Sequence, residues 1–176
     1  MVKASNKTIG LVGGTFDPAH KGHLAITKIA IKKLKLSKVL WIVTKKNPFK
    51  HKPYYSLFQR LKKAKELTKG TKKIQIMHLD KKVNSSRSSD IINYLVNRKK
   101  LKNIYFIIGS DNLINFHKWK DWKKIVKLTK LIVFSRKGYD RKGGKSTVTK
   151  YYKNKITFIN NKPIIISSTK LRNKLV

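Results

Sequence analysis

The chain has 176 residues, of which 44 are Lys or Arg and only 7 are Asp or Glu, so its formal net charge at pH 7 is +37. It contains no cysteine, which excludes disulfides, thiolate metal sites and cysteine nucleophiles. It also lacks a long apolar run of the kind found in secretion signals or membrane spans, so we expect one cytoplasmic domain over residues 1–176.

Short apolar runs rich in β-branched residues alternate along the chain with stretches of helical period. In chain order, strands are predicted at residues 8–12, 39–43, 74–78, 104–108 and 131–134. Apolar residues recur at helical spacing in the intervening segments, around residues 24–34, 57–67, 91–95 and 122–126. This alternation predicts a doubly wound, Rossmann-like α/β fold with a mostly parallel sheet and helices on both faces. Residues 135–147 are predicted to form an exposed loop.

The chemically informative segments follow the predicted strands. In open α/β sheets, ligands bind beyond the carboxyl ends of the strands, where the strand order reverses. The segments in question are GGTFDPAHKGH (13–23), TKKNPFKHK (44–52), GSDNLINFHKW (109–119) and, following the apolar run at 164–166, ISSTKLR (166–172). We therefore expect these segments to meet at one edge of the sheet.

The first of these segments has the composition of a phosphate site. Gly13 and Gly14 lack a Cβ, so backbone amides there can approach an anion closely. Asp17 precedes a proline and favours a turn into a helix, whose N-terminus is partly positive. His20 and His23 lie three residues apart at that helix start, which places both imidazoles on one side. Together these residues indicate a cluster of donors for phosphate oxygens.

Two motifs resemble those of the nucleotidyltransferases. HKGH at residues 20–23 is similar to their T/H-x-G-H signature, and residues 166–172 are similar to their I-S-S-T-x-x-R signature. Within that superfamily the chain most resembles the bacterial nicotinate-nucleotide adenylyltransferases, through the segments GGTFDPAHKGH, WIVTKKNPFK, IIGSDNL, FHKWKDW and SRKGYD. The pantetheine-phosphate adenylyltransferases share the two signatures, whereas FHKWKDW and IGSDNL distinguish the two groups. The resemblance covers nearly the whole chain.

The resemblance implies transfer of AMP from ATP to nicotinate mononucleotide, giving nicotinate adenine dinucleotide and pyrophosphate in NAD biosynthesis. The attacking phosphate oxygen is already ionised at neutral pH, so the reaction needs alignment and charge stabilisation rather than a general base. This chemistry suits a chain with few carboxylates. The implied cofactor is Mg²⁺, held mainly by the ATP phosphates rather than by protein ligands, with Asp17 placed to orient a metal-bound water.

The resemblance also implies roles on the ATP side. His20 and His23 are expected to contact the phosphates, with His23 at the α-phosphate, and Arg172 adds a charge-assisted donor. Main-chain contacts to the nucleotide are expected from Gly13, Gly14, Thr15 and Phe16. Ser168 and Thr169 open the last predicted helix, where hydroxyls and free amides meet phosphate. The alternatives are that Ser168 and Thr169 only cap that helix and that Phe16 only packs.

On the acceptor side, the resemblance places Trp119 against the nicotinate ring. Trp122 instead belongs to the apolar stripe of its helix and is expected in the core. Asp111 is expected to hold a ribose or a ring edge, with helix capping as the alternative. The remaining acceptor candidates are Asn47, Lys50 and Ser88. Lys50 has a solvated surface charge as its alternative.

One segment departs from the family pattern. Where SSRSSDII (residues 85–92) has Arg87 and Ser88, relatives usually carry an aromatic residue and a threonine. The departure bears on the choice of acceptor, because the threonine lies at the acceptor in those relatives. Nicotinamide mononucleotide and phosphopantetheine therefore remain as alternative acceptors for the same chemistry.

The excess of basic residues supports a third hypothesis. A net charge of +37 attracts polyanions, as in a non-enzymatic module that binds nucleic acid. The lysines, however, are spread along the whole chain and accompany abundant Ile and Asn, which share A/T-rich codons with Lys. Compositional drift at surface positions accounts for this pattern. We therefore expect ATP and nicotinate mononucleotide as partners, no specific nucleic acid and no membrane, and the sequence is compatible with an oligomer.

Overall fold

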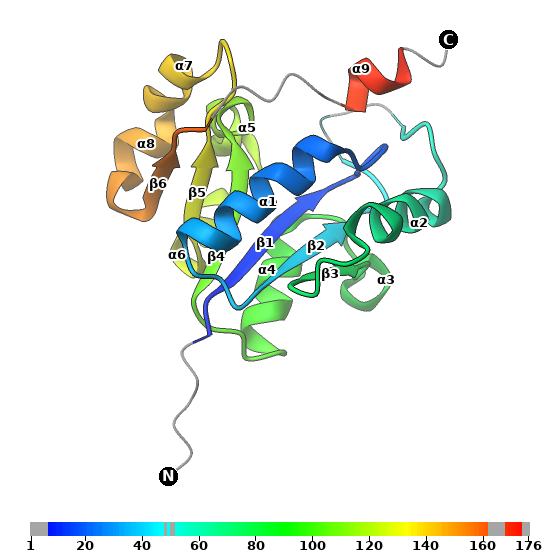
Figure 1. Cartoon of the computed structure of the whole chain (residues 1–176). Helices are drawn as coiled ribbons and strands as arrows, with labels where there is room; N and C mark the ends of the chain where they lie inside the picture. The colour runs from blue at the N-terminus through cyan, green and yellow to red at the C-terminus, as the bar shows by residue number, and fades with distance from the viewer. Residues whose placement is uncertain (1–6, 48, 50–51, 162–167, 174–176) are drawn as a thin grey trace.

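The computed structural model describes residues 7–47, 49, 52–161 and 168–173. These residues form a six-stranded sheet in which every neighbouring pair of strands is parallel (Figure 1). The strands are β1 (Ile9–Gly14), β2 (Lys38–Val43), β3 (Ile74–Met77), β4 (Ile104–Gly109), β5 (Lys130–Phe134) and β6 (Ile156–Ile159). Their order across the sheet is β3-β2-β1-β4-β5-β6. This is the order of a doubly wound fold, so the predicted fold class is confirmed.

The strand order reverses between β1 and β4, and there the sheet opens. β1 pairs with β2 along six residues, from Ile9 to Gly14. Its pairing with β4 covers only three residues and stops at Leu11 and Phe106. Because β1 continues to Gly14 and β4 to Gly109, their carboxyl ends diverge and leave a crevice between them.

Helices cover both faces of this sheet (Figure 1). One face is covered by α1 (Lys21–Lys33) and α2 (Leu57–Thr68). The other face is covered by α4 (Ser88–Asn97), α5 (Ser110–Ile114), α6 (Trp122–Leu128) and α8 (Thr147–Tyr152). Shorter elements complete the described chain: α3 (Asp80–Val83), α7 (Asp140–Gly144), α9 (Ser168–Arg172) and the 3-10 turns Phe116–Lys118 and Lys153–Lys155. None of the helices seen in these residues has both the length and the apolar composition needed to cross a bilayer.

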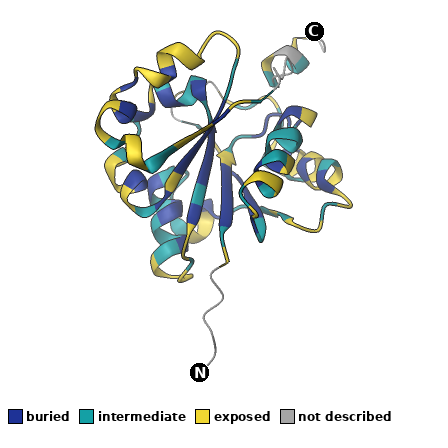
Figure 2. Cartoon of the chain, turned by 60° about the vertical axis from the view of Figure 1, so that its left-hand side comes forward, coloured by how far each residue is buried: buried dark blue, intermediate teal, exposed yellow. Residues whose placement is uncertain are grey.

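The core consists of two apolar layers separated by the sheet. Successive residues of a strand point to opposite faces, so Leu11 and Leu40 pack into one layer while Val12 and Trp41 pack into the other. Strands β1, β2, β4 and β5 are buried along most of their length, whereas the edge strands β3 and β6 are more open, and many exposed residues lie on the outer surfaces of the helices (Figure 2). Burial on both faces explains why the strands are continuous apolar runs in the sequence.

Two expectations differ from the structure. Residues 135–147 are not a plain loop, because α7 occupies Asp140–Gly144 and α8 begins at Thr147. The buried Gly143 allows this close packing, since a Cβ there would lie 3.2 Å from the carbonyl oxygen of Ser110. Strand β6 follows at Ile156–Ile159 and was not predicted. The apolar run at 164–166 lies outside the described residues.

Gly10, in the middle of β1, has no room for a side chain. A Cβ at this position would lie 2.8 Å from Cδ1 of Leu36 and 2.9 Å from Cγ2 of Val39, and both residues are fully buried. We expect Gly10→Ala to lower the free energy of unfolding by about 1–3 kcal/mol through overpacking. Urea denaturation would measure the change. Gly144→Ala is the control, because a Cβ at that position would meet nothing within 4 Å, and it should be neutral.

Candidate functional site

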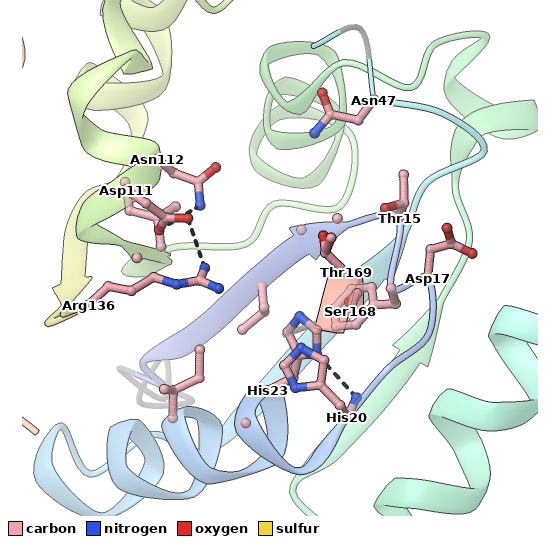
Figure 3. Close-up of a pocket in the computed structure, with 18 of the residues that line it drawn as sticks. Thr15, Asp17, His20, His23, Asn47, Asp111, Asn112, Arg136, Ser168 and Thr169 are labelled. Atoms are coloured by element: carbon pink, nitrogen blue, oxygen red, sulfur yellow. Dashed lines mark hydrogen bonds and ion pairs between the residues drawn. The ribbon is translucent and has the colours of Figure 1, made fainter. Parts of the chain in front are cut away.

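A cavity of about 780 Å³ occupies the crevice at the carboxyl ends of β1 and β4 (Figure 3). A second cavity of about 290 Å³ adjoins it and shares the lining residues Gly13, Gly14, Asn47, Phe49 and Trp119. Both cavities are lined by loops that follow parallel strands, as the sequence predicts. Figure 3 shows that His20 and His23 approach the larger cavity from the start of α1.

The two imidazoles form a compact pair. Their ring centroids lie 3.8 Å apart, and the backbone N–H of His20 donates to Nδ1 of His23 at 3.3 Å. Because Nδ1 accepts this bond, a neutral His23 ring carries its proton on Nε2. His23 therefore has a defined tautomer, with Nε2 as its donor.

Aromatic packing and a short relay of hydrogen bonds hold His23 in place. Phe16 packs against the His23 ring and stacks on Trp41, with 4.9 Å between centroids in each case, and His23 also meets Trp41 edge-on. Nε1 of Trp41 donates to the Thr27 hydroxyl, which donates to the carbonyl of His23. Phe16 has a positive φ of 47°, a conformation that is disfavoured outside glycine and is retained here by this packing.

His20 is nearly buried, and its charge state follows from that burial. Burial lowers the pKa of His20 from 6.5 to about 4, and the guanidinium of Arg136 acts in the same direction. The ring is therefore neutral at physiological pH. It can exchange hydrogen bonds with a ligand without bringing a full charge into the cavity.

The last described helix docks on the loop that precedes the histidines. The Ser168 hydroxyl donates to the carbonyl of Pro18 at 2.9 Å. Nη1 of Arg172 donates to the carbonyl of Asp17 at 2.5 Å and lies 3.4 Å from its carboxylate. These contacts place Ser168, Thr169 and Arg172 on the wall of the larger cavity, although they come at the far end of the chain from the histidines.

An ion pair forms another wall of the larger cavity. Nη1 of Arg136 contacts the Asp111 carboxylate at 2.8 Å, and the backbone N–H of Arg136 donates to Ser110 and Asp140. In Figure 3 this pair faces Thr15 across the cavity. Arg136 thus adds a cation to a site that already contains two imidazoles and Arg172.

The smaller cavity combines an aromatic face with cationic side chains. Trp119 stacks on Phe116 with 4.9 Å between centroids and also lines both cavities. Ser88 and Asn47 line the smaller cavity as well. The charged residues among its described lining are all basic: Lys46, Arg87, Lys118 and Lys120. This cavity is suited to a planar ring that carries negative charge.

The carboxylates near the cavities are already engaged. The two oxygens of Asp17 accept the backbone N–H groups of Tyr55 and Tyr54, at 2.9 Å each. Asp111 is paired with Arg136. Within the part of the chain that the structure describes, no three His, Asp or Glu side chains come together as a metal site would require. These residues do not form a protein cage for Mg²⁺.

The structure brings most of the predicted site residues together. The larger cavity is lined by Gly13, Gly14, Thr15, Phe16, His20, His23, Asn47, Asp111, Trp119, Ser168, Thr169 and Arg172. Ser88 lines only the smaller cavity, whereas Asp111 lines only the larger one. Lys50 lies outside the described residues. Trp122 was expected in the core but is half-buried at its edge, where it meets Tyr152 edge-on, and Trp119 packs against the same core.

Sequence reasoning missed Arg136. It belongs to the SRKGYD segment, which resembles the family pattern but was interpreted as a loop. The available signal was its position: Arg136 lies two residues beyond the end of β5, at the edge of the sheet where ligands bind. In the sequence, only this position after a strand separates Arg136 from the many basic residues on the surface.

The fold has relatives among solved structures. The structure of the Plasmodium falciparum nicotinic acid mononucleotide adenylyltransferase complexed with NaAD is similar to this chain with a TM-score of 0.77. The match covers 95% of this chain and 83% of that one, at 19% sequence identity. At this identity the similarity establishes the fold.

Sequence comparisons define the family. A cytidylyltransferase-like family profile matches residues 11–174. The "Probable nicotinate-nucleotide adenylyltransferase" of Pelagibacter ubique is 49% identical over 179 residues, which cover 98% of this chain and 99% of the relative. A protein of the same name from Ruegeria sp. is 35% identical, over 74% of this chain and 69% of its own length. The chain therefore belongs to the cytidylyltransferase-like family and, within it, to the nicotinate-nucleotide adenylyltransferases.

Proposed function

We propose that this chain transfers AMP from ATP to nicotinate mononucleotide, forming nicotinate adenine dinucleotide and pyrophosphate. One observation supports this proposal above all others. His20, His23 and Arg172 line a single cavity at the point where the strand order reverses. Two imidazoles and a guanidinium around one cavity are suited to a triphosphate. We further propose that residues 1–176 act as one nucleotidyltransferase domain in the cytoplasm.

The larger cavity is the proposed ATP site. Backbone groups of the 13–16 loop contact the nucleotide, and the hydroxyls of Ser168 and Thr169 contact its phosphates. His20 and His23 reach the phosphates from the start of α1, with Nε2 of His23 directed at the α-phosphate. Asp111 lines only this cavity, and we assign it a ribose hydroxyl at the boundary between the two nucleotides.

The smaller cavity is the proposed acceptor site. The nicotinate ring packs on Trp119, and Asn47 and Ser88 offer hydrogen bonds to the acceptor. Lys50 remains a candidate for the acceptor phosphate. Gly13 and Gly14 line both cavities, which supports an arrangement in which the acceptor phosphate lies beside the α-phosphate of ATP. The basic lining favours an acceptor whose ring bears a carboxylate over one whose ring bears a carboxamide.

The reaction then depends on alignment and charge stabilisation. The acceptor phosphate oxygen attacks the α-phosphorus, and the bond from that phosphorus to the pyrophosphate oxygen breaks. Negative charge builds on the α-phosphate and on the departing pyrophosphate, where His23 and Arg172 donate hydrogen bonds. No proton has to be removed from the nucleophile. Mg²⁺ would be held mainly by the ATP phosphates, with Asp17 placed to orient a metal-bound water, and when bound it would neutralise phosphate charge.

The proposal is tested by measuring pyrophosphate release. Purified protein is incubated with ATP and Mg²⁺ and with nicotinate mononucleotide, nicotinamide mononucleotide or phosphopantetheine in turn. We expect the highest kcat/KM with nicotinate mononucleotide. Turnover with phosphopantetheine alone would contradict the assigned substrate, and absence of turnover with all three would contradict the assigned activity.

Two substitutions of His23 test its role in that assay. His23→Asn keeps a polar group near the position of Nδ1 but lacks Nε2, and His23→Ala lacks both. Each variant should fold and lose about 10²-fold or more in kcat, because one donor to the developing charge is removed. Normal kcat in His23→Asn would exclude Nε2 from the mechanism.

Because folded His20 is neutral, the free energy of unfolding should depend on pH. The unfolded chain protonates this residue near pH 6.5, whereas the folded protein does so only near pH 4. Between these values the unfolded state binds the extra proton, so the free energy of unfolding falls as the pH is lowered from 6.5 to 4. His20→Asn should show a shallower fall. Urea denaturation of both proteins across this range measures it, and parallel curves would contradict the lowered pKa.

Arg87 is expected to contribute to acceptor choice. Nicotinate and nicotinamide mononucleotides share the same phosphate, so the ratio of their kcat/KM values isolates the ring substituent. We expect Arg87→Gln to lower the preference for nicotinate about tenfold, as for loss of one charge-assisted hydrogen bond. Arg98→Gln, at the opposite end of α4 and outside both cavities, is the matched control. If the ratio of the two kcat/KM values is the same in Arg87→Gln and Arg98→Gln, Arg87 does not contribute to acceptor recognition.

A further inference from the structure

Arg60 is a buried arginine that does not line either cavity. It lies in the first turn of α2, and only 2% of its surface is exposed. Its guanidinium donates to four backbone carbonyl oxygens. They belong to Thr15 at 2.6 Å, Thr44 at 2.7 Å, Lys45 at 3.1 Å and Tyr55 at 3.1 Å. This number of bonds is unusual for a side chain that could have remained in water.

The four carbonyls belong to two loops around the site: Thr15 lies in the loop between β1 and α1, and the other three lie in the loop between β2 and α2. Thr15 follows β1 and lines the larger cavity, in the loop that leads to His20. Thr44 follows β2 and lines the smaller cavity, in the loop that leads to Asn47. The same nitrogen, Nη1, bonds both carbonyls. One planar group therefore connects the loop of the proposed ATP site with the loop of the proposed acceptor site.

Two carboxylates surround this arginine and extend the network. Burial lowers the pKa of Arg60, while the charges of Asp17 and Asp80 act to raise it. Asp17 accepts the backbone N–H groups of Tyr54 and Tyr55. Asp80 accepts the backbone N–H of Lys45 at 2.7 Å and also the hydroxyl of Ser86, which lines the smaller cavity. The charge of Arg60 is thus balanced by residues that hold the same loops.

We propose that Arg60 is a positioning residue that sets the distance between the ATP loop and the acceptor loop. This inference rests on the proposed adenylyl transfer. Each substrate binds mainly to one of the two loops, so a change in their separation affects each binding step only slightly. In-line attack requires both phosphates in register, and displacement of about 1 Å is enough to cost about 10²-fold in rate.

Arg60→Lys is the test variant. Lysine keeps the positive charge but lacks the planar fork that reaches carbonyls of different loops at once. We expect kcat to fall about 10²-fold. We expect the Kd values of a non-hydrolysable ATP analogue and of nicotinate mononucleotide, each measured alone by calorimetry, to change little. A loss of kcat without a comparable loss of binding is the signature of altered alignment.

Thr68→Val is the matched control on the same helix. The Thr68 hydroxyl is also buried and donates to the carbonyl of Ala64, at the C-terminal end of α2 and outside both cavities. Thermal unfolding ranks the stability of the two variants. Thr68→Val should keep normal kcat. If it loses as much kcat as Arg60→Lys, or if Arg60→Lys keeps wild-type kcat, Arg60 has no positioning role.

Amide hydrogen exchange provides a readout that does not depend on turnover. In Arg60→Lys the amides of Thr44, Tyr54 and Tyr55 should exchange faster than in wild type, while the amides of β5 stay protected. Unchanged exchange at these three amides would overturn the inference. Failure of the wild-type protein to turn over any acceptor would instead count against the proposed function, so the two results are distinguishable.

Discussion

The geometry of the site depends on the hydrogen bonds and the ion pair that the Asp17 carboxylate makes. It accepts the backbone N–H groups of Tyr54 and Tyr55 and lies beside the guanidinium of Arg172. A single side chain therefore joins the loop after β1, the segment that enters α2, and α9. Without it, two backbone donors would lose their partner in a partly buried environment, and the last helix would lose an attachment to the histidine loop.

The scarcity of acidic residues makes their positions informative. In a chain with seven Asp and Glu residues, five carboxylates accept hydrogen bonds in or next to the loops at the carboxyl edge of the sheet. They are Asp17, Asp80, Asp90, Asp111 and Asp140. Each fixes a loop or pairs with a cation instead of standing ready for proton transfer. This use of carboxylates agrees with a reaction whose nucleophile is already ionised.

The sequence predicted the fold and most of the residues that line the candidate site. Strands buried on both faces appear as apolar runs, and His20 and His23 stand in a compact motif whose spacing is local. Arg60 and Arg136 were not recognised in the sequence. In a chain with so many basic residues, the residue type alone does not separate a buried or paired arginine from an exposed one. Their roles follow from contacts with carbonyls and carboxylates that are distant in sequence. Strand β6 was missed, although β3, which has the same length and lies at the opposite edge of the sheet, was predicted.

The basic lining of the smaller cavity affects the rates at which nucleotides bind and leave, as well as which acceptor is recognised. Lys46, Arg87, Lys118 and Lys120 are exposed at its rim, within reach of a diffusing anion. Such a rim accelerates capture of nucleotides from solution, and ionic strength screens this attraction over about 8 Å at physiological salt. The same attraction retains a dinucleotide once it is made. Added salt should therefore weaken retention of the product as well as capture of the substrates.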